Sequence, residues 1–185
     1  MDERELLTLV KADETMMSAL QAARELNLPD WWIAAGFVRS KVWDVLSGMS
    51  ARTRLPDIDV IYFDAGDPDE ATEKRYETEL RLRMPDMPWS VKNQARMHAV
   101  SGRAPYRSSL DAVANYPETA TALALSLDAD GQPVLGAPHG LADVVAMLVA
   151  PTPAFAANPA LYDIFERRIE AKRWDRIWPS VSYAR

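Results

Sequence analysis

Hydrophobic residues recur at intervals of three and four over residues 2–27, which is the spacing of one face of a helix. Pro29 ends that pattern, because a proline disfavours helical geometry in the residue before it. A short apolar run over residues 32–35 is typical of a buried strand, and Gly36 interrupts it. Helical spacing then returns over residues 38–46. The first part of the chain therefore predicts a helix, a strand and a second helix.

The rest of the chain alternates between the same two patterns. Residues 57–63 are rich in β-branched and aromatic side chains and predict a strand, and residues 89–98 predict another, with a helix as the alternative. Residues 128–131 read Asp-Ala-Asp-Gly and predict a hairpin turn. The remaining predicted elements are helices over residues 69–82, 108–115, 141–149 and 158–174, and strands over residues 119–127 and 133–135.

This alternation of helices and short strands indicates an α+β domain of α/β type, with a small mixed sheet flanked by helices. A chain of 185 residues with 48% hydrophobic content suits one domain with a sizeable core. We expect an N-terminal helix within residues 1–30, a core over residues 31–150, and a C-terminal helical appendage over residues 151–185 that packs on the core.

Charge and composition narrow the functional classes. The formal net charge of −6 argues against a general nucleic-acid-binding surface, because such surfaces neutralise phosphates with basic residues. The chain has no cysteine, which excludes disulfides, thiolate metal sites and a cysteine nucleophile, and two histidines are too few for a multi-histidine zinc site. The acidic start does not resemble a secretory signal, and no apolar segment approaches the roughly 20 residues that span a bilayer. We therefore expect a soluble, cytoplasmic protein that does not bind membranes.

Asp57 and Asp59 stand two residues apart in a predicted strand, so both side chains project from one face of the sheet. Two neighbouring carboxylates repel each other unless a cation joins them. Magnesium prefers oxygen ligands and bridges carboxylates to substrate phosphates. The pair therefore indicates a magnesium site, although in isolation the same pattern also fits two surface acids on a half-exposed strand.

Gly36 and Arg39 mark a second feature, the turn from the first strand into a helix. A glycine there lets backbone N–H groups approach a phosphate, and the N-terminus of a helix favours negative charge. Arg39 adds a planar fork of donors in the first helical turn. The alternative is a structural turn whose arginine pairs with Asp44 or with solvent. Because the turn and the aspartates belong to successive predicted strands, we expect them to form one site.

Residues 35–40, 43–48 and 57–60 together resemble the head of the polymerase-β-type nucleotidyltransferase superfamily, which includes tRNA nucleotidyltransferases and bacterial poly(A) polymerases. The chain is more similar still to a group of small bacterial nucleotidyltransferase-like proteins. That likeness continues through residues 62–64, 91–98, 137–143 and 172–174.

The resemblance implies a nucleotidyltransferase fold and the transfer of a nucleotidyl group from a nucleoside triphosphate to an acceptor, with two Mg²⁺ ions. It implies metal binding and catalysis by Asp57 and Asp59, and phosphate contacts by Gly36 and Arg39. We expect further nucleotide contacts from three nearby cationic residues, Lys41, Arg52 and Arg54.

The chain departs from the wider family pattern in three ways. Ala35 replaces the first glycine, Ser40 replaces an acid, and the third carboxylate is not evident, with Asp64, Asp111 and Asp128 as candidates. A site with two acids fits nucleotide binding with or without turnover. The alternative function is therefore a catalytically degenerate nucleotide-binding or protein-interaction domain. For an enzyme, the acceptors compatible with this sequence are a small molecule, a protein or an RNA end.

Further polar residues have two interpretations each. Lys92, Arg96 and His98 share a face if their segment is a strand, either as a basic platform for triphosphate or acceptor, or as solvated charge. The basic run over residues 167–174 fits contact with a polynucleotide or, more simply, a solvated helix whose cations suit its C-terminus. His139, between a proline and a glycine, is interpreted as structural.

Overall fold

A five-stranded mixed sheet forms the centre of the computed structural model, which describes residues 1–184 apart from the side chain of Ser101. The α-helices are α1 (Glu3–Lys11), α2 (Glu14–Arg24), α3 (Gly36–Leu46), α4 (Glu70–Arg83), α5 (Gln94–Ser101), α6 (Ser109–Ala114), α7 (Ala142–Val145), α8 (Pro153–Ala156) and α9 (Pro159–Lys172). The strands are β1 (Trp32–Ala34), β2 (Ile58–Tyr62), β3 (Trp89–Asn93), β4 (Ala124–Leu127), β5 (Pro133–Gly136), β6 (Leu148–Val149) and β7 (Ser182–Tyr183). Two 3-10 helices are η1 (Thr119–Thr121) and η2 (Trp174–Arg176). We find no helix among these that combines the length and the hydrophobicity of a transmembrane span.

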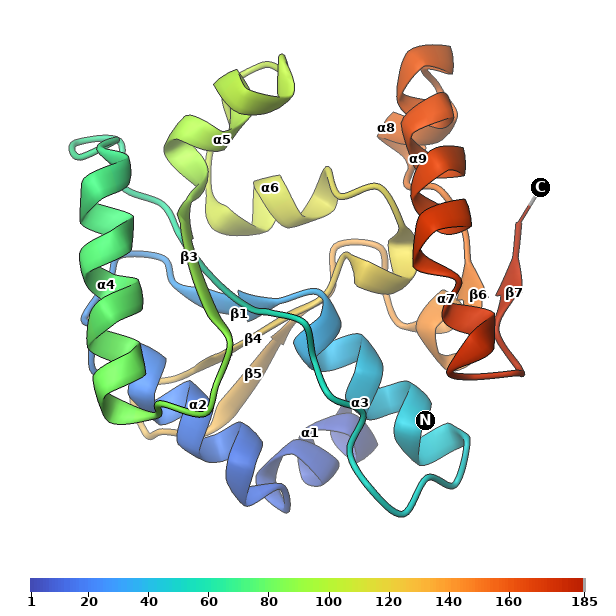
Figure 1. Cartoon of the computed structure of the whole chain (residues 1–185), viewed down its shortest axis with the longest axis horizontal. Coiled ribbons are helices and arrows are strands. Elements are labelled where there is room, and N and C mark those ends of the chain that lie inside the picture. Colours follow the sequence, from blue (N-terminus) through green and yellow to red (C-terminus); the bar gives the residue numbers. More distant parts are fainter. Residues whose placement is uncertain (185) are drawn as a thin grey trace.

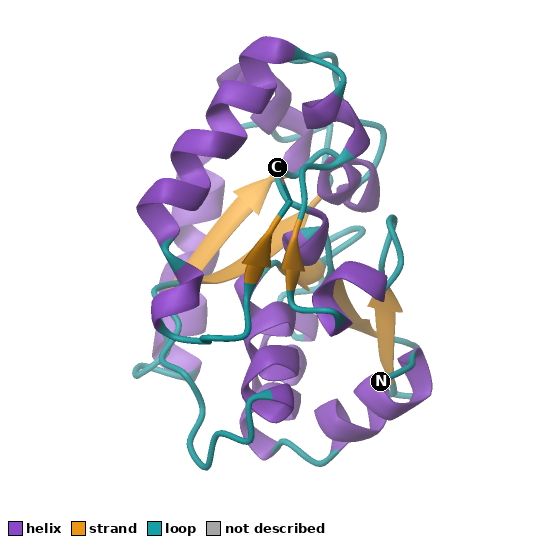
Figure 2. Ribbon diagram, turned by 90° about the vertical axis from the view of Figure 1, so that its right-hand side faces the viewer, coloured by secondary structure: helices purple, strands orange, loops and turns teal. Residues whose placement is uncertain are grey.

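The strand order is β3-β2-β1-β4-β5, with β2 and β3 parallel and the other neighbours antiparallel. Helices α1 and α2 lie on one side of this sheet and α6 on the other (Figure 1). A second, parallel pair of strands, β6 and β7, ties the end of the chain to the region after α7 (Figure 2). The expected fold class, a small mixed sheet flanked by helices, is confirmed.

The two faces of the sheet belong to separate hydrophobic clusters. Ile33, Val60 and Leu125 occupy one face and belong to the large hydrophobic cluster that includes the N-terminal helices. On the other face, Ala34 lies opposite Asp59 in the register and packs in a smaller cluster with residues of α6, among them Val113.

Several predicted elements divide in the structure. The single helix expected over residues 2–27 is two helices, because Asp13 accepts a hydrogen bond from the backbone N–H of Met16 at 3.0 Å and so starts a new helix. Residues 89–98 form β3 and then α5, whose N-cap is Asn93. The expected strand over residues 119–127 is η1 followed by β4, and the helix over residues 141–149 is only α7 followed by β6.

Buried carboxylates of α4 cover the outer edge of β3, which is one of the two edge strands of the sheet. Glu73 accepts a hydrogen bond from the backbone N–H of Asn93 at 2.8 Å, and Glu77 accepts one from that of Val91 at 3.2 Å. Glu73 is fully buried, and Arg96 donates to both of its oxygens at 2.7 Å. These bonds occupy N–H groups that an open edge would offer to another chain.

Lys92, Arg96 and His98 do not share the face of one strand, which the interpretation as a basic platform required. Lys92 lies on β3, whereas Arg96 and His98 lie on α5. Lys92 and Arg96 both form ion pairs with Glu73, at 3.3 and 2.7 Å. Two of the three cations are therefore structural partners of a buried acid.

We predict that Glu73→Gln lowers the free energy of unfolding by about 3 kcal/mol at pH 7, because it leaves two cations facing a neutral buried group. Burial raises the pKa of Glu73, but the bonds from Arg96 and from the backbone of Asn93 outweigh it and hold the pKa below its usual value. The carboxylate's contribution is therefore present above its unfolded pKa and is lost as the pH falls through the depressed folded pKa. Urea unfolding of the parent protein and of Glu73→Gln at pH 7 and pH 4 measures the difference in unfolding free energy.

The matched control is Glu79→Gln on the same helix, because Glu79 pairs with Arg83 while 45% of its side chain is exposed. It should cost less than about 1 kcal/mol. An equal loss of unfolding free energy in the two variants would contradict a special role for Glu73.

Candidate functional site

One cavity of about 490 Å³ brings together residues from both ends of the sequence. The start of α3, the loop before β2 and the start of β2 form one part of its wall, and α9 with the segment after it forms the rest. Five of the site residues predicted from the sequence line it, namely Gly36, Arg39, Arg54, Asp57 and Asp59, and so do Ala35 and Ser40. The C-terminal segment adds Arg168, Lys172, Trp174, Ile177 and Trp178.

The two aspartates lie at the beginning of β2. Asp57 is exposed and precedes the strand, and Asp59 is half-buried within it. Burial and the negative charge of Asp57 raise the pKa of Asp59 to about 6, whereas a hydrogen bond with Ser90 and the charges of Arg168 and Lys172 act in the opposite direction. Two carboxylates that repel each other beside an open cavity suit the binding of a cation.

Among the described residues, no group of three His, Cys, Asp or Glu side chains is placed to hold a metal. The structure therefore shows no third acid beside Asp57 and Asp59 in the part of the chain that it describes. The three candidates from the sequence do not line the cavity. Asp64 and Asp128 accept hydrogen bonds from nearby backbone N–H groups, and Asp111 pairs with Arg107. A cation here would therefore complete its coordination with water and substrate oxygens.

The turn into α3 carries backbone strain at Ala35. Ala35 has φ 56° and ψ −116°, a conformation that favours glycine. Gly36 does not have a positive φ, and an added Cβ would meet Arg39 Nη2 at an ordinary 3.5 Å. Helix α3 begins without a side-chain cap, so its N-terminus faces the cavity without a competing side-chain acceptor. Strain retained beside a cavity is typical of functional sites.

The guanidinium of Arg39 is buried among three indole rings. Its carbon lies 5.1, 4.7 and 5.7 Å from the ring centroids of Trp43, Trp174 and Trp178. Only 7% of Arg39 is exposed, and burial lowers its pKa to about 10. Nη2 donates to Ser40 Oγ at 3.2 Å, and Nε has no hydrogen-bond partner among the described residues. The site thus holds a desolvated cation, Arg39, with at least one N–H donor that is not used within the described residues.

Asp44, which was one expected partner of Arg39, instead joins the two halves of the cavity wall. It accepts hydrogen bonds from Trp178 Nε1 at 2.8 Å and from the backbone N–H and hydroxyl of Thr53 at 2.8 and 2.6 Å. One buried carboxylate therefore holds the loop before β2 and one of the rings that contact Arg39.

The remaining predicted cations take different positions. Lys41 pairs with Asp13 at 2.9 Å and does not line the cavity. Arg52 also faces Asp13, at 3.7 Å, and its guanidinium lies 5.4 Å from the ring centroid of Phe37. Arg54 is exposed and does line the cavity. The structure thus brings only Arg54 of these three beside the aspartates.

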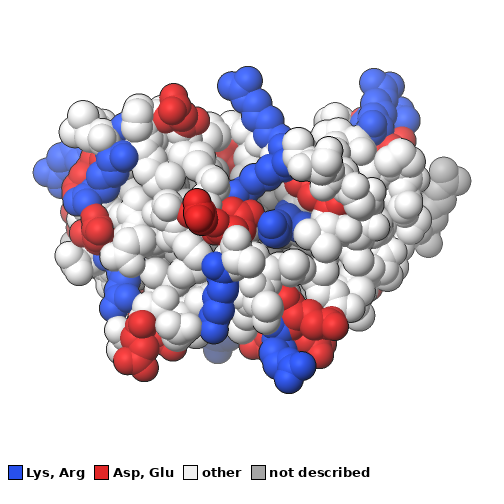
Figure 3. All heavy atoms as spheres, turned by 90° about the horizontal axis from the view of Figure 1, so that it is seen from below, with Lys and Arg blue, Asp and Glu red and all other residues white. Residues whose placement is uncertain are grey.

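Sequence reasoning did not assign Arg168 and Lys172 to the site. Their spacing of four residues places both on one face of α9, which was the available signal, but no local pattern indicates what that face meets. On the face of the molecule seen in Figure 3, acidic and basic side chains lie next to one another near the middle. Glu118 was also missed: it is fully buried and accepts a hydrogen bond from Arg168 Nε at 2.5 Å.

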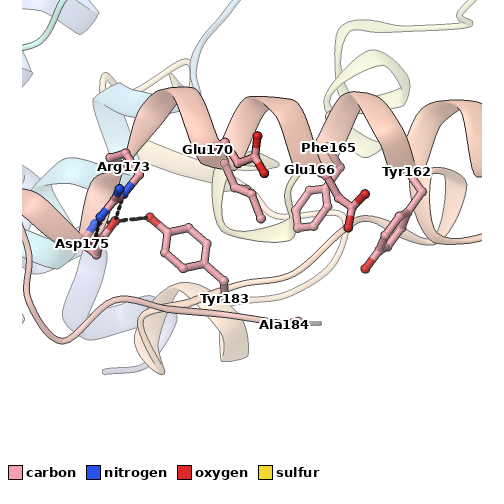
Figure 4. A pocket seen from close by; sticks show the side chains of 9 residues that line it. Tyr162, Phe165, Glu166, Glu170, Arg173, Asp175, Tyr183 and Ala184 are labelled. Atoms are coloured by element: carbon pink, nitrogen blue, oxygen red, sulfur yellow. Dashed lines mark hydrogen bonds and ion pairs between the residues drawn. The ribbon is translucent and has the colours of Figure 1, made fainter.

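A second face of α9 borders a separate cavity of about 630 Å³, shown in Figure 4. Its polar groups are Glu166, Glu170 and a cluster in which Asp175 pairs with Arg173 at 3.0 Å and accepts from the Tyr183 hydroxyl at 2.9 Å. Helix α9 is therefore acidic towards this cavity and basic towards the aspartate pair.

We predict that Ala35→Gly raises the free energy of unfolding by about 1 kcal/mol, because relief of the positive φ exceeds the entropic cost of glycine. Ala34→Gly, at the neighbouring buried strand position, should lower it by about 1 kcal/mol. Urea denaturation of the two variants gives the comparison. An Ala35→Gly variant less stable than the parent chain would contradict the strain.

We predict that Asp59→Asn stabilises the metal-free protein. The folded pKa of about 6 lies above the ordinary 3.8, so the stability contributed by this carboxyl is complete below pH 3.8 and is lost as the pH rises through 6. The gain from asparagine should therefore grow between pH 4 and 6 and level off at about 2–3 kcal/mol. Thermal unfolding in a chelating buffer across this range measures it, and a gain that does not change with pH would contradict the raised pKa.

Comparison with known proteins agrees with this geometry. Residues 21–183 match the profile of a family described as nucleotidyltransferase. A solved structure described as a CCA-adding enzyme head domain is 35% identical, with a TM-score of 0.89 over 99% of this chain and 96% of that one. A CCA-adding enzyme in complex with ATP shares the fold at 14% identity and a TM-score of 0.54, and this chain covers 41% of its length. A search of curated proteins found no significant match.

The profile match spans most of the chain and includes the turn at Gly36, the aspartate pair and the C-terminal cations. This chain belongs to the nucleotidyltransferase family.

Proposed function

We propose that this protein transfers a nucleotidyl group from a nucleoside triphosphate to a hydroxyl-bearing acceptor in a Mg²⁺-dependent reaction. The observation that carries the proposal is the shared cavity, in which Asp57 and Asp59 face the uncapped N-terminus of α3 and the buried guanidinium of Arg39. Carboxylates for a metal and donors for phosphate are the two requirements of nucleotidyl transfer, and both are present on one wall.

The chain's own groups would bind and orient the nucleotide. Backbone N–H groups at the start of α3 favour a phosphate, and the strained Ala35 sets their direction. Arg39 offers a planar fork of donors already stripped of water, so binding an anion there costs little further desolvation. Trp174 and Trp178 form an apolar wall beside it, which limits the access of water to the phosphates.

The donor set of the aspartate pair fits Mg²⁺, which binds through one or two carboxylates and keeps its other positions for water and phosphate oxygens. Asp57 and Asp59 would hold the ion. When bound, Mg²⁺ would neutralise charge on the triphosphate and assist ionisation of the attacking hydroxyl. Release of the mutual repulsion between the two aspartates favours that binding.

The second candidate is a nucleotide-binding domain without turnover. It is favoured by one observation, the lack of a third acid beside the pair among the described residues. Both candidates predict nucleotide binding, and they differ only in release of pyrophosphate.

We predict that the purified protein, given each nucleoside triphosphate with Mg²⁺ and a panel of acceptors, releases pyrophosphate. The panel contains short RNA, small alcohols and a protein substrate mixture. Asp57→Asn and Asp59→Asn should each lower the rate at least about 100-fold, because each removes a charge that stabilises the reacting phosphate through the metal.

The control is Asp130→Asn, which changes an exposed acid in the β4–β5 turn. Unchanged turnover in the Asp57 and Asp59 variants would overturn the site assignment. Magnesium-dependent ATP binding that both variants lose, without pyrophosphate release by the parent protein, would favour the non-enzymatic candidate.

A further inference from the structure

We propose that Arg168 and Lys172 of α9 hold the terminal phosphates of the bound nucleoside triphosphate. This assignment rests on the proposed nucleotide site and adds to it a second anchor, opposite the start of α3. The C-terminal helix would thereby take part directly in substrate binding rather than only covering the core.

The balance of charge in the cavity is the first support. Its lining carries four cationic side chains and two carboxylates, although the whole chain has a net charge of −6. The cations are Arg39, Arg54, Arg168 and Lys172. An excess of positive charge concentrated in one hollow of an acidic protein favours an anion with several charges, which fits a triphosphate better than an uncharged acceptor.

The fixation of Arg168 is the second support. Its Nε donates to Glu118 at 2.5 Å, and the other oxygen of Glu118 accepts from the hydroxyl of Thr121 at 2.7 Å. Glu118 is fully buried, so it holds the guanidinium in one orientation, while 37% of the Arg168 side chain remains exposed. An arginine held through Nε keeps its two terminal nitrogens for a second partner, and bidentate binding of phosphate uses such a pair of donors.

The position of the two cations relative to the aspartates is the third support. Arg168 and Lys172 line the same cavity as Asp57 and Asp59. The ion pair of Arg168 is with Glu118 rather than with an aspartate of the pair, and Lys172 is exposed. They are therefore close to the proposed metal site yet available for an anion bound there.

The test is calorimetric binding of ATP, AMP and inorganic tripolyphosphate, each with Mg²⁺, to the parent protein and its variants. Lys172→Ala and Arg168→Ala should each weaken ATP and tripolyphosphate binding about tenfold or more, and leave AMP binding within about twofold, because AMP lacks the terminal phosphates. Arg168→Lys keeps the charge, but a lysine ammonium lacks the planar set of donors that lets an arginine bind Glu118 and phosphate at once. This variant should therefore also weaken ATP binding.

Arg167→Ala is the matched control, because Arg167 is exposed on the same helix and does not line the cavity. Arg168→Ala leaves the buried Glu118 without its arginine, so thermal unfolding of each variant is measured in parallel. Lys172→Ala changes an exposed side chain and keeps the test valid if Arg168→Ala unfolds.

The outcomes separate this inference from the proposed function. ATP affinity unchanged in Lys172→Ala and Arg168→Lys, with pyrophosphate release still lost in Asp59→Asn, would overturn the inference alone. Variants that lose affinity for ATP and for AMP equally would overturn it too. Variants that keep their affinity for ATP but lose affinity for a single-stranded RNA would also overturn it. A parent protein that binds neither ATP nor tripolyphosphate would overturn both proposals.

Discussion

The buried guanidinium of Arg39 is the constraint on which the site depends. A cation removed from water is costly unless other groups replace its hydration. Three tryptophan rings surround this one within 6 Å, and two of them, Trp174 and Trp178, come from the end of the chain. The rings also pack edge to face, with the centroids of Trp43 and Trp178 5.1 Å apart. Helix α3 and the C-terminal segment therefore meet around the same cation.

This arrangement makes the two ends of the sequence interdependent. Asp44 on α3 hydrogen-bonds to Trp178, and Trp43 Nε1 donates to the carbonyl of Val144 at 2.9 Å. Glu118, before η1, holds Arg168 of α9. Each contact links segments that are far apart in sequence, and two of them, Asp44 with Trp178 and Glu118 with Arg168, hold residues that line the cavity. The C-terminal region thus lines part of the candidate site.

Features set by local spacing were predictable from the sequence. The two-residue period of Asp57 and Asp59 and the glycine after the first strand indicated neighbouring strands and a helix N-terminus, and the structure places them on one cavity. Positions fixed by long-range partners were not predictable. Lys41 stands close to the turn in sequence, but its ammonium pairs with Asp13, 28 residues earlier.

The same limit applies to the C-terminal cations. A basic, exposed helix end has the same local sequence whether it faces solvent or a substrate, because only tertiary contacts decide which. Arg168 became part of the site through a buried acid 50 residues away in the sequence. The strain at Ala35 was likewise hidden, since the sequence showed a missing glycine but not the backbone angles that the turn imposes.

We propose one site for magnesium and nucleotide, made by the aspartate pair, the start of α3 and the tryptophans around Arg39. Titration of ¹⁵N-labelled protein with ATP and Mg²⁺, followed by NMR, tests it most directly. We expect the shift changes to concentrate at the backbone amides of Gly36 and Asp59 and at the indole N–H of Trp178. Changes confined to the cavity beside Tyr162 and Tyr183, with those signals unmoved, would contradict it.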